Sequence, residues 1–436
     1  MSCRLRGRAA FAVATAAALL SGCARNEPHA AALAGSWPQY QRVASHNAVL
    51  ARAAFSVRWN FDARARINGG LAVVGGRIFL DTFAGEMLSL HLATGTLAWK
   101  HRADNVVMST PVVGDGLVIF GTGRNGASGG TNKSFVYAGG AATGKTIDFW
   151  GRPAGDHLLA YDAASGARRW AYRTAGEDMP SPAIAGGRVI FANGDAHAYA
   201  LSLRGGHARW QRSLGGIATM TSVNLAAGTA FVSVCFHSMQ RAQSLALAPR
   251  TGRILWRAPD GNCDSAPTYG RGRLFLSGVS GNTAAFGFGA RATVAALDAR
   301  TGRLLWRYRG SHAGPYSKVG SSERAIAGTY ARGTYYQPIP TTDELLAFDA
   351  ASGAIRWRFR SNGAIKMSPI VAGGHLFVGD AAGLFYSIDA RTGRLLAVKM
   401  FAHPFATAPP VLVGNTLLLV NGEHVFALPL AQGVLR

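Results

Sequence analysis

Two carboxylates and one amide lie in the turns between short β-rich segments of this sequence. Glu177, Asn262 and Asp264 offer oxygen ligands of the kind that bind a hard cation such as Ca²⁺. Three cationic residues occur in turns of the same class, and they would face an anionic ligand: Lys318, Arg324 and Lys366. The alternative for all six is that they are polar residues that cap turns.

Four methionines fall near one relative position of the same turns: Met108, Met179, Met220 and Met367. Thioether sulfur binds soft Cu(I), but these residues could also form an adaptable apolar rim or fill the core. Phe149 and Trp150 belong to a long insertion, residues 121–157, which we interpret as a lid or partner-binding loop. Its AATGKT stretch (141–146) lacks the full spacing of a phosphate-binding loop.

The four cysteines divide into two pairs. Cys3 and Cys23 lie near the N-terminus, whereas Cys235 and Cys263 lie far from it. Outside the cytoplasm such a remaining pair predicts one disulfide, and a reactive thiol is the alternative. The sequence contains no CxxC, CxxCH or HExxH motif and no recognisable Ser/His/Asp arrangement. We therefore expect no catalytic residue, unless Asp264 acts as a base.

The first residues have the features of an export signal. Three arginines precede a short apolar stretch that ends in Leu20-Ser21-Gly22-Cys23. This ending resembles a bacterial lipobox, which implies a signal peptide at 1–22 and a lipid on Cys23; an ordinary export signal with a chance cysteine is the alternative. Residues 23–53 would form a tether to a domain at 54–436. We expect a periplasm-facing protein anchored to the bacterial membrane, in the outer membrane.

The formal net charge of +23 limits the choice of partner. Nucleic acid is the usual partner of a strongly basic protein, but an exported protein rarely meets it. A protein of the envelope or an anionic envelope polymer is therefore the expected partner, and the chain would be a monomer within a complex. The alternative is a basic proteome in which arginine replaces lysine throughout.

A repeated unit positions all of these residues. In six copies a Gly lies four residues before a Trp, as in LDARTGRLLW (297–306), and a weaker copy has Ala397 in place of Trp. Self-similarity at 40 to 50 residues indicates stacked units. In the seventh unit we assign strands A to D to 366–371, 375–380, 384–389 and 394–399. The recurring tryptophans are expected to pack between neighbouring units: Trp59, Trp99, Trp170, Trp210, Trp256, Trp306 and Trp357.

Eight sets of strands A to C follow from this division, but only seven D strands follow them. The spare D-like strand is SVRWNFDA (56–63), which precedes the first set. The predicted fold is thus an all-β, eight-bladed propeller of four-stranded antiparallel blades, closed by the N-terminal strand. A seven-bladed ring with one degenerate repeat is the nearest alternative.

The (Y/F/L)-D-A-x-(T/S)-G-x-x-x-W unit resembles the repeat of pyrroloquinoline quinone (PQQ) propellers, as do Trp37-Pro38-Gln39-Tyr40 and RWNFDA (58–63). One branch of this family comprises PQQ- and Ca²⁺-dependent dehydrogenases of alcohols or sugars. For that branch the resemblance implies Ca²⁺ at Glu177 and Asn262, Asp264 as base, and PQQ beside the three cationic residues. The other branch comprises non-catalytic propellers, including those of outer-membrane protein assembly. The missing Cys-Cys pair, the missing haem domain and the short chain favour a binding scaffold that needs no cofactor.

Overall fold

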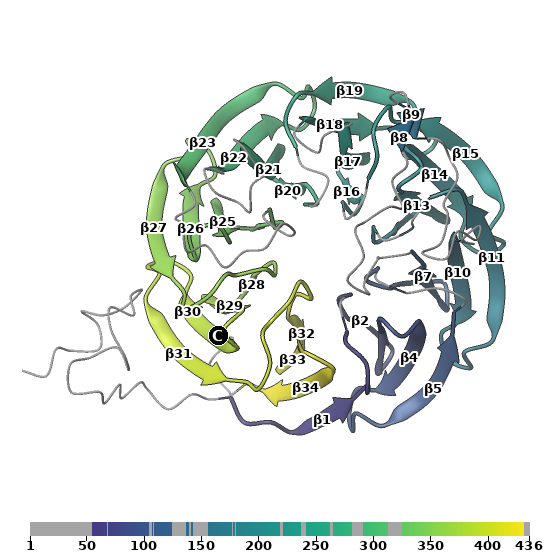
Figure 1. Cartoon of the computed structure of the whole chain (residues 1–436), viewed down its shortest axis with the longest axis horizontal. Helices are drawn as coiled ribbons and strands as arrows, with labels where there is room; N and C mark the ends of the chain where they lie inside the picture. The colour runs from purple at the N-terminus through teal and green to yellow at the C-terminus, as the bar shows by residue number, and fades with distance from the viewer. Residues whose placement is uncertain are drawn as a thin grey trace, which may run out of the picture.

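Eight four-stranded antiparallel sheets form a closed ring in the computed structural model, so the predicted eight-bladed propeller is confirmed (Figure 1). The structure describes residues 55–67, 69–103, 107, 109–123, 137–138, 141–142, 156–176, 178, 180–218, 221–236, 241–261, 265–280, 291–312 and 325–430. The predicted signal peptide and tether lie outside these ranges. No helix within them is long and apolar enough to cross a bilayer.

The innermost strands, A, are three residues long and contact one another around the centre of the ring. They are β2 (Ala72–Val74), β6 (Val112–Gly114), β12 (Ala183–Ala185), β16 (Asn224–Ala226), β20 (Thr268–Gly270), β24 (Thr329–Ala331), β28 (Ile370–Ala372) and β32 (Val411–Val413). The A strands are shorter than expected: β28 begins at Ile370 and not at Lys366. Pro369 directly precedes it, and proline has no N–H to donate to a strand ladder.

The middle strands, B and C, are almost completely buried and supply the core. The B strands are β3 (Arg77–Asp81), β7 (Leu117–Gly121), β13 (Arg188–Ala192), β17 (Thr229–Phe236), β21 (Arg273–Ser280), β25 (Thr334–Ile339), β29 (His375–Gly379) and β33 (Thr416–Asn421). The C strands are β4 (Glu86–His91), β10 (Asp156–Asp162), β14 (His197–Ser202), β18 (Arg241–Leu247), β22 (Arg291–Asp298), β26 (Glu344–Asp349), β30 (Leu384–Asp389) and β34 (His424–Pro429).

The outermost strands, D, run around the wall of the ring (Figure 1). They are β5 (Leu97–Arg102), β11 (Arg168–Thr174), β15 (Ala208–Ser213), β19 (Ile254–Ala258), β23 (Leu304–His312), β27 (Ile355–Arg360), β31 (Leu395–Met400) and β1 (Trp59–Asp62). The predicted closure is confirmed, because β1 pairs antiparallel with β34 from Trp59↔Ala427 to Asp62↔His424. The N-terminal strand therefore completes the eighth blade.

Each recurring tryptophan joins its blade to the next one. Its Nε1–H donates to a carbonyl oxygen in the C–D turn of the following blade, over 2.9 to 3.2 Å in all seven cases. The ring also lies against the glycine of that turn: Trp256 covers Gly302, where a Cβ would lie 2.8 Å from the indole. Glycine is required for two reasons. One is this close contact with the indole, and the other is that the seven turn glycines have φ between 66° and 77°. The predicted inter-blade packing of the tryptophans is confirmed.

The closure of the ring explains why the seventh unit has Ala397. A tryptophan there would face the C–D turn of the eighth blade, but β34 and β1 are the two ends of the ring and no such turn connects them. Phe55 from the N-terminal segment lies at this seam instead. Its ring centroid is 6.4 Å from that of Phe377, whereas Trp256 and Trp306 lie 6.0 Å from the equivalent phenylalanines of their own blades. Phe55 therefore takes over the packing role of the missing indole.

Candidate binding face

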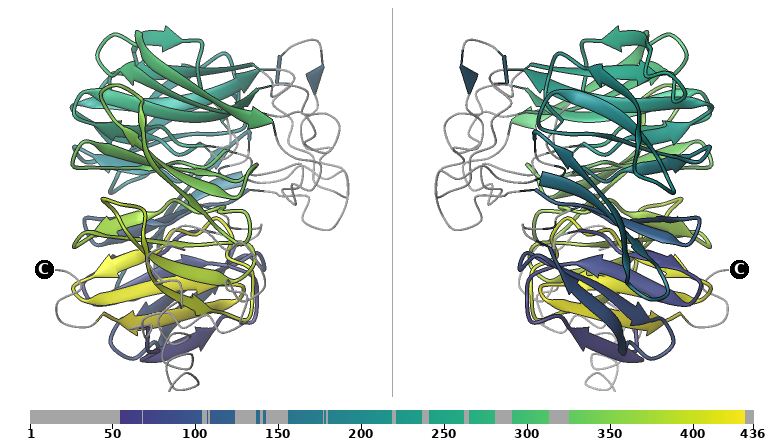
Figure 2. Two further views of the ribbon diagram at one scale, coloured as in Figure 1. Left: turned by 90° about the vertical axis from the view of Figure 1, so that its left-hand side faces the viewer. Right: turned by 90° about the vertical axis from the view of Figure 1, so that its right-hand side faces the viewer.

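The B–C and D–A connections lie together on one face of the propeller, and the A–B and C–D turns lie on the other. The two-stranded sheet of β8 (Tyr137–Ala138) and β9 (Ala141–Ala142), from the predicted insertion, projects on the first side (Figure 2). We call this side the variable face, because its connections differ in length from blade to blade. Binding residues concentrate on such loops, which a rigid scaffold positions.

Most of the residues predicted from the sequence for lipid attachment, for the disulfide or for binding fall outside the described residues. These are Cys23, Met108, Phe149, Trp150, Glu177, Met179, Met220, Asn262, Cys263, Asp264, Lys318 and Arg324. Their predicted roles stay predictions. The structure does place Cys235, Lys366 and Met367.

Met367 and Lys366 are neighbours in the connection that enters β28, but their side chains lie in different surroundings. Met367 is 1% exposed within the core of the seventh blade, where its Sδ accepts a hydrogen bond from the Gly379 N–H over 3.2 Å. Lys366 is half-buried and stands four residues before the A strand, the position that Met108, Met179 and Met220 hold in their blades. Met367 is one residue out of register with those methionines, so its side chain packs in the core and does not join a rim.

Cys235 lies near the end of β17, where it is 1% exposed and disulfide-bonded. Its backbone also forms an isolated bridge with Ile217 of the preceding D–A connection. The disulfide restrains the end of the fourth blade on the variable face. Cys263 remains the predicted partner.

A buried polar network holds the variable face of the third blade. Asp178 accepts hydrogen bonds from Thr174 Oγ1 over 2.6 Å and from Asn193 Nδ2 over 3.1 Å. Asp195 accepts one from the Tyr199 hydroxyl over 2.5 Å, and burial together with this carboxylate raises the pKa of Tyr199. These contacts tie the B–C turn to the D–A connection beside it, so they position the face.

Similar turn locks occur in the seventh and eighth blades. Asp380 is fully buried and accepts hydrogen bonds from the Tyr386 hydroxyl and from three backbone N–H groups, those of Asn362, Ala382 and Leu384. The Asn421 side chain bonds both backbone polar groups of His403. These residues were not predicted from the sequence. Their signal is an Asn or Asp five residues after the first residue of a B strand, a position that Asn193, Asp380 and Asn421 share.

Asp81 is a buried carboxylate of a different kind. It ends β3 with no exposed surface, and neither oxygen accepts a hydrogen bond of normal geometry from the residues that the structure describes. Burial raises its pKa well above the ordinary value of 3.8, and the nearby Gly69 N–H opposes this shift without reversing it. Asp81 is thus held in its neutral form over a wider pH range than an exposed aspartate.

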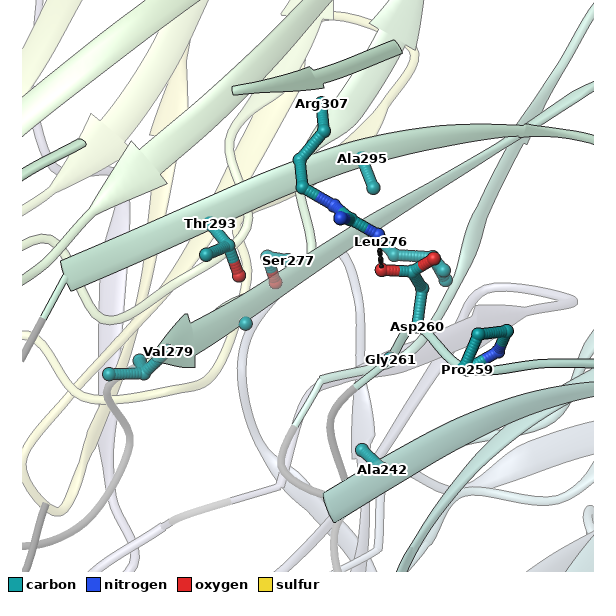
Figure 3. A pocket seen from close by; sticks show the side chains of 11 residues that line it. Ala242, Pro259, Asp260, Gly261, Leu276, Ser277, Val279, Thr293, Ala295 and Arg307 are labelled. Atoms are coloured by element: carbon teal, nitrogen blue, oxygen red, sulfur yellow. Dashed lines mark hydrogen bonds and ion pairs between the residues drawn. The ribbon is translucent and has the colours of Figure 1, made fainter. Parts of the chain in front are cut away.

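A small polar cavity opens between the fourth and fifth blades (Figure 3). It measures about 110 Å³, and its lining includes Ser277, Thr293 and Gly261, which has φ of 146°. Arg307 reaches across one end and pairs with Asp260 over 2.5 Å. The volume is well below the roughly 300 Å³ at which pockets for drug-sized ligands begin. A cavity of this size fits water or a small polar group.

One group of described residues has the composition of a metal site. Three potential ligand atoms lie within 4.8 Å of one another. They belong to Asp62 of β1, to His424, the first residue of β34, and to Glu423, which precedes it. Two of the three side chains are exposed, and the group lies where the ring closes. It was not predicted, because its members are 361 positions apart in the chain and only strand pairing brings them together.

A family model described as outer membrane protein assembly factor BamB matches residues 48–244, 223–331 and 290–436, almost the whole propeller. This chain belongs to the PQQ-like repeat β-propeller family. The predicted resemblance is therefore confirmed.

Known proteins with different names resemble this chain over most of its length. A tetrathionate hydrolase of Acidithiobacillus ferrooxidans is 23% identical over 381 residues, which cover 83% of this chain and 72% of the hydrolase. The crystal structure of BamB from Moraxella catarrhalis superposes with a TM-score of 0.61 at 17% identity, over 86% of this chain and 99% of BamB. A europium-containing methanol dehydrogenase superposes with a TM-score of 0.62 at 14% identity, over 89% and 90%. These structural matches establish the fold, which enzymes and non-enzymes share.

Proposed function

We propose that this PQQ-like propeller is an exported, lipid-anchored binding scaffold without catalytic activity, and that it acts in outer-membrane protein assembly. The observation that carries the proposal is the match to BamB. The BamB family model spans nearly the whole propeller, and the structural match takes in 99% of the Moraxella chain. The two molecules thus share a complete propeller, whereas one tenth of the methanol dehydrogenase chain has no counterpart here.

The polar residues described on the variable face support a scaffold role. Asp178, Asn193 and Asp380 form hydrogen bonds that join B–C turns to the D–A connections beside them. Such contacts produce a rigid surface of fixed shape, which suits recognition of a partner protein. The proposed partner is a protein of the envelope that contacts this face.

The scaffold proposal is tested in a bacterium that lacks this protein. We expect lower levels of β-barrel proteins in its outer membrane, restored by the wild-type chain. The Cys23→Ala variant should restore them poorly, because it has no site for the lipid. Normal β-barrel levels in the deletion strain would contradict the proposal.

The second candidate is a PQQ- and Ca²⁺-dependent dehydrogenase, which the structural likeness to a methanol dehydrogenase favours. Of the residues predicted to hold these groups, only Lys366 is described, so we derive no catalytic step. Thermal unfolding of the purified protein with PQQ, in the presence and absence of Ca²⁺, tests this candidate. A Ca²⁺-dependent rise in the unfolding temperature, with dye-linked oxidation of alcohols or sugars, would replace the scaffold proposal. Tetrathionate should be assayed alongside, given the hydrolase relative.

A further inference from the structure

The outer wall of the propeller carries a concentration of positive charge. In each D strand alternate side chains face outward, as β27 shows: Arg356, Arg358 and Arg360 are exposed, whereas Trp357 and Phe359 are buried. Relative to each tryptophan, the outward positions are one residue before it and one and three residues after it. We call these positions on blades one to six the outer belt.

Eleven of the eighteen belt positions hold Lys or Arg and none holds Asp or Glu, although Lys and Arg make up only 45 of the 436 residues. All eleven are exposed: Lys100, Arg102, Arg169, Arg173, Arg209, Arg257, Arg307, Arg309, Arg356, Arg358 and Arg360. The belt ends at the seventh blade, whose outward residues are Leu396, Val398 and Met400. In the closure strand β1 the corresponding positions hold Arg58, Asn60 and Asp62, so one cation there is matched by one carboxylate. The excess of positive charge is therefore confined to the arc from the first blade to the sixth.

Carboxylates neutralise less than half of this charge. Lys100, Arg169, Arg307, Arg356 and Arg358 pair with acidic residues of neighbouring strands and connections, over 2.5 to 3.6 Å. The other six have no carboxylate within ion-pair distance among the residues that the structure describes. Charged side chains protect an exposed strand edge from pairing with another chain. That protection explains charge of either sign, but it does not explain why every charged residue of the belt is a cation.

The curvature of the belt restricts the kind of partner. A folded chain of this size has a radius of gyration of roughly 2 nm, whereas duplex DNA stays straight over about 50 nm. A duplex or a flat bilayer would therefore touch the wall at one or two blades only. Single-stranded nucleic acid bends easily, but its binding sites normally offer aromatic rings on which bases stack. None of the eighteen belt positions is aromatic.

We propose that the outer belt binds a flexible acidic polysaccharide, which follows the wall from the first blade to the sixth. Carboxylate groups repeated along a bendable chain can pair with successive arginines, and arginine is well suited to bidentate contacts with carboxylates. The belt lies on the outer wall and borders the variable face where the D strands end. Polysaccharide binding is measured without any envelope protein, so this proposal can fail while the scaffold proposal stands, and the reverse.

The test uses the purified protein and polygalacturonate as the probe, with binding measured at low and at raised salt. The belt variant combines Arg102→Gln, Arg173→Gln, Arg309→Gln and Arg360→Gln, none of which breaks an observed ion pair. The control removes the same charge from exposed turns of the opposite face, with Arg250→Gln, Arg271→Gln, Arg332→Gln and Arg391→Gln. Matching thermal unfolding curves would establish that both variants are folded.

We expect the belt variant to lose about tenfold or more in affinity and the control to lose much less, with raised salt weakening wild-type binding. Equal losses in the two variants would show that net charge alone attracts the polymer, and would overturn the proposal. Tighter binding to a single-stranded oligonucleotide, or to phosphatidylglycerol vesicles, than to polygalacturonate of equal charge would also overturn it.

Discussion

At the residue scale, two buried aspartates of equivalent blades show how surroundings decide the role of a side chain. Asp380 and Asp81 are both inaccessible to solvent at the ends of B strands. Asp380 uses both oxygens to hold a turn, whereas neither oxygen of Asp81 accepts a hydrogen bond of normal geometry from the described residues. A buried polar group without a partner costs stability, and a charged one costs more.

Replacing Asp81 with asparagine should therefore stabilise the protein at neutral pH. The raised pKa means that the folded state keeps a proton that the unfolded chain releases above pH 3.8, so this residue costs more stability as the pH rises above that value. Asparagine has a similar shape and no charge to bury. We expect Asp81→Asn to gain about 1–3 kcal/mol at pH 7, with the gain vanishing near pH 4, in urea unfolding curves.

Asp380→Asn is the matched control for this experiment. In one orientation its amide nitrogen would face two donors, the Tyr386 hydroxyl and the Asn362 N–H. In the other it would face the N–H groups of Ala382 and Leu384. Donors oppose one another in both cases, so stability should fall at pH 7. A loss of stability in Asp81→Asn at pH 7 would show that the carboxylate has a stabilising partner.

At the scale of the structural element, the C–D turn is the part that recurs most faithfully. Its glycine has two functions: a positive φ, and room for the indole of the preceding blade. The A–B turn has glycines of similar φ that face open space. This difference allows the contribution of the indole contact to be separated from that of backbone strain.

Gly302→Ala and Gly272→Ala form the comparison. Their φ values are 74° and 76°, but a Cβ at Gly302 would lie 2.8 Å from Trp256, whereas a Cβ at Gly272 would meet nothing within 4 Å. Both substitutions lower the free energy of unfolding by about 1 kcal/mol or more, because alanine is strained in the left-handed backbone conformation. We expect Gly302→Ala to lose a further 1–3 kcal/mol from displacement of the indole, measured by thermal unfolding. Equal losses would mean that the indole contact adds nothing.

The same regularity explains what could be predicted from the sequence. The D-A-x-T-G-x-x-x-W unit recurs because each blade must offer a turn to its neighbour, and strands B, C and D of the seventh blade were predicted within one residue. The variable face has no such constraint. The turn locks at Asn193 and Asp380 depend on partners in other connections, which spacing alone does not reveal. The register of Met367 was missed for the same reason.

At the scale of the whole molecule, the ring is closed by contacts between its two ends. β1 completes the sheet that β32, β33 and β34 begin, and Phe55 packs beside Phe377 and Phe385 of the seventh blade. Ala397 could be interpreted only after this closure was known. From the sequence, the unit that contains Ala397 was a weak copy of the repeat. In the ring, its strand β31 is the one D strand that has no C–D turn of a following blade to contact.

Phe55→Ala should weaken this closure. The side chain is 5% exposed within the largest cluster of buried residues, and removing a buried phenylalanine costs about 3–5 kcal/mol. Val57→Ala is the control, because Val57 lies two residues away and is 42% exposed. Thermal unfolding should show a large loss for the first variant and a small one for the second. Similar losses would contradict a role for Phe55 at the seam.

The pairing of Trp59 with Ala427 also has a consequence for how the molecule is made. Synthesis delivers the N-terminus first, yet β1 has no partner until β34 follows. Closing so long a loop is slow, because its entropy is lost before any contact forms. A chain that stops early, at any blade, is left as an open arc with an unpaired strand at its start. The completed ring is thus formed only by a chain that includes β34. Chains that stop earlier would be open to proteases that cut unpaired strands.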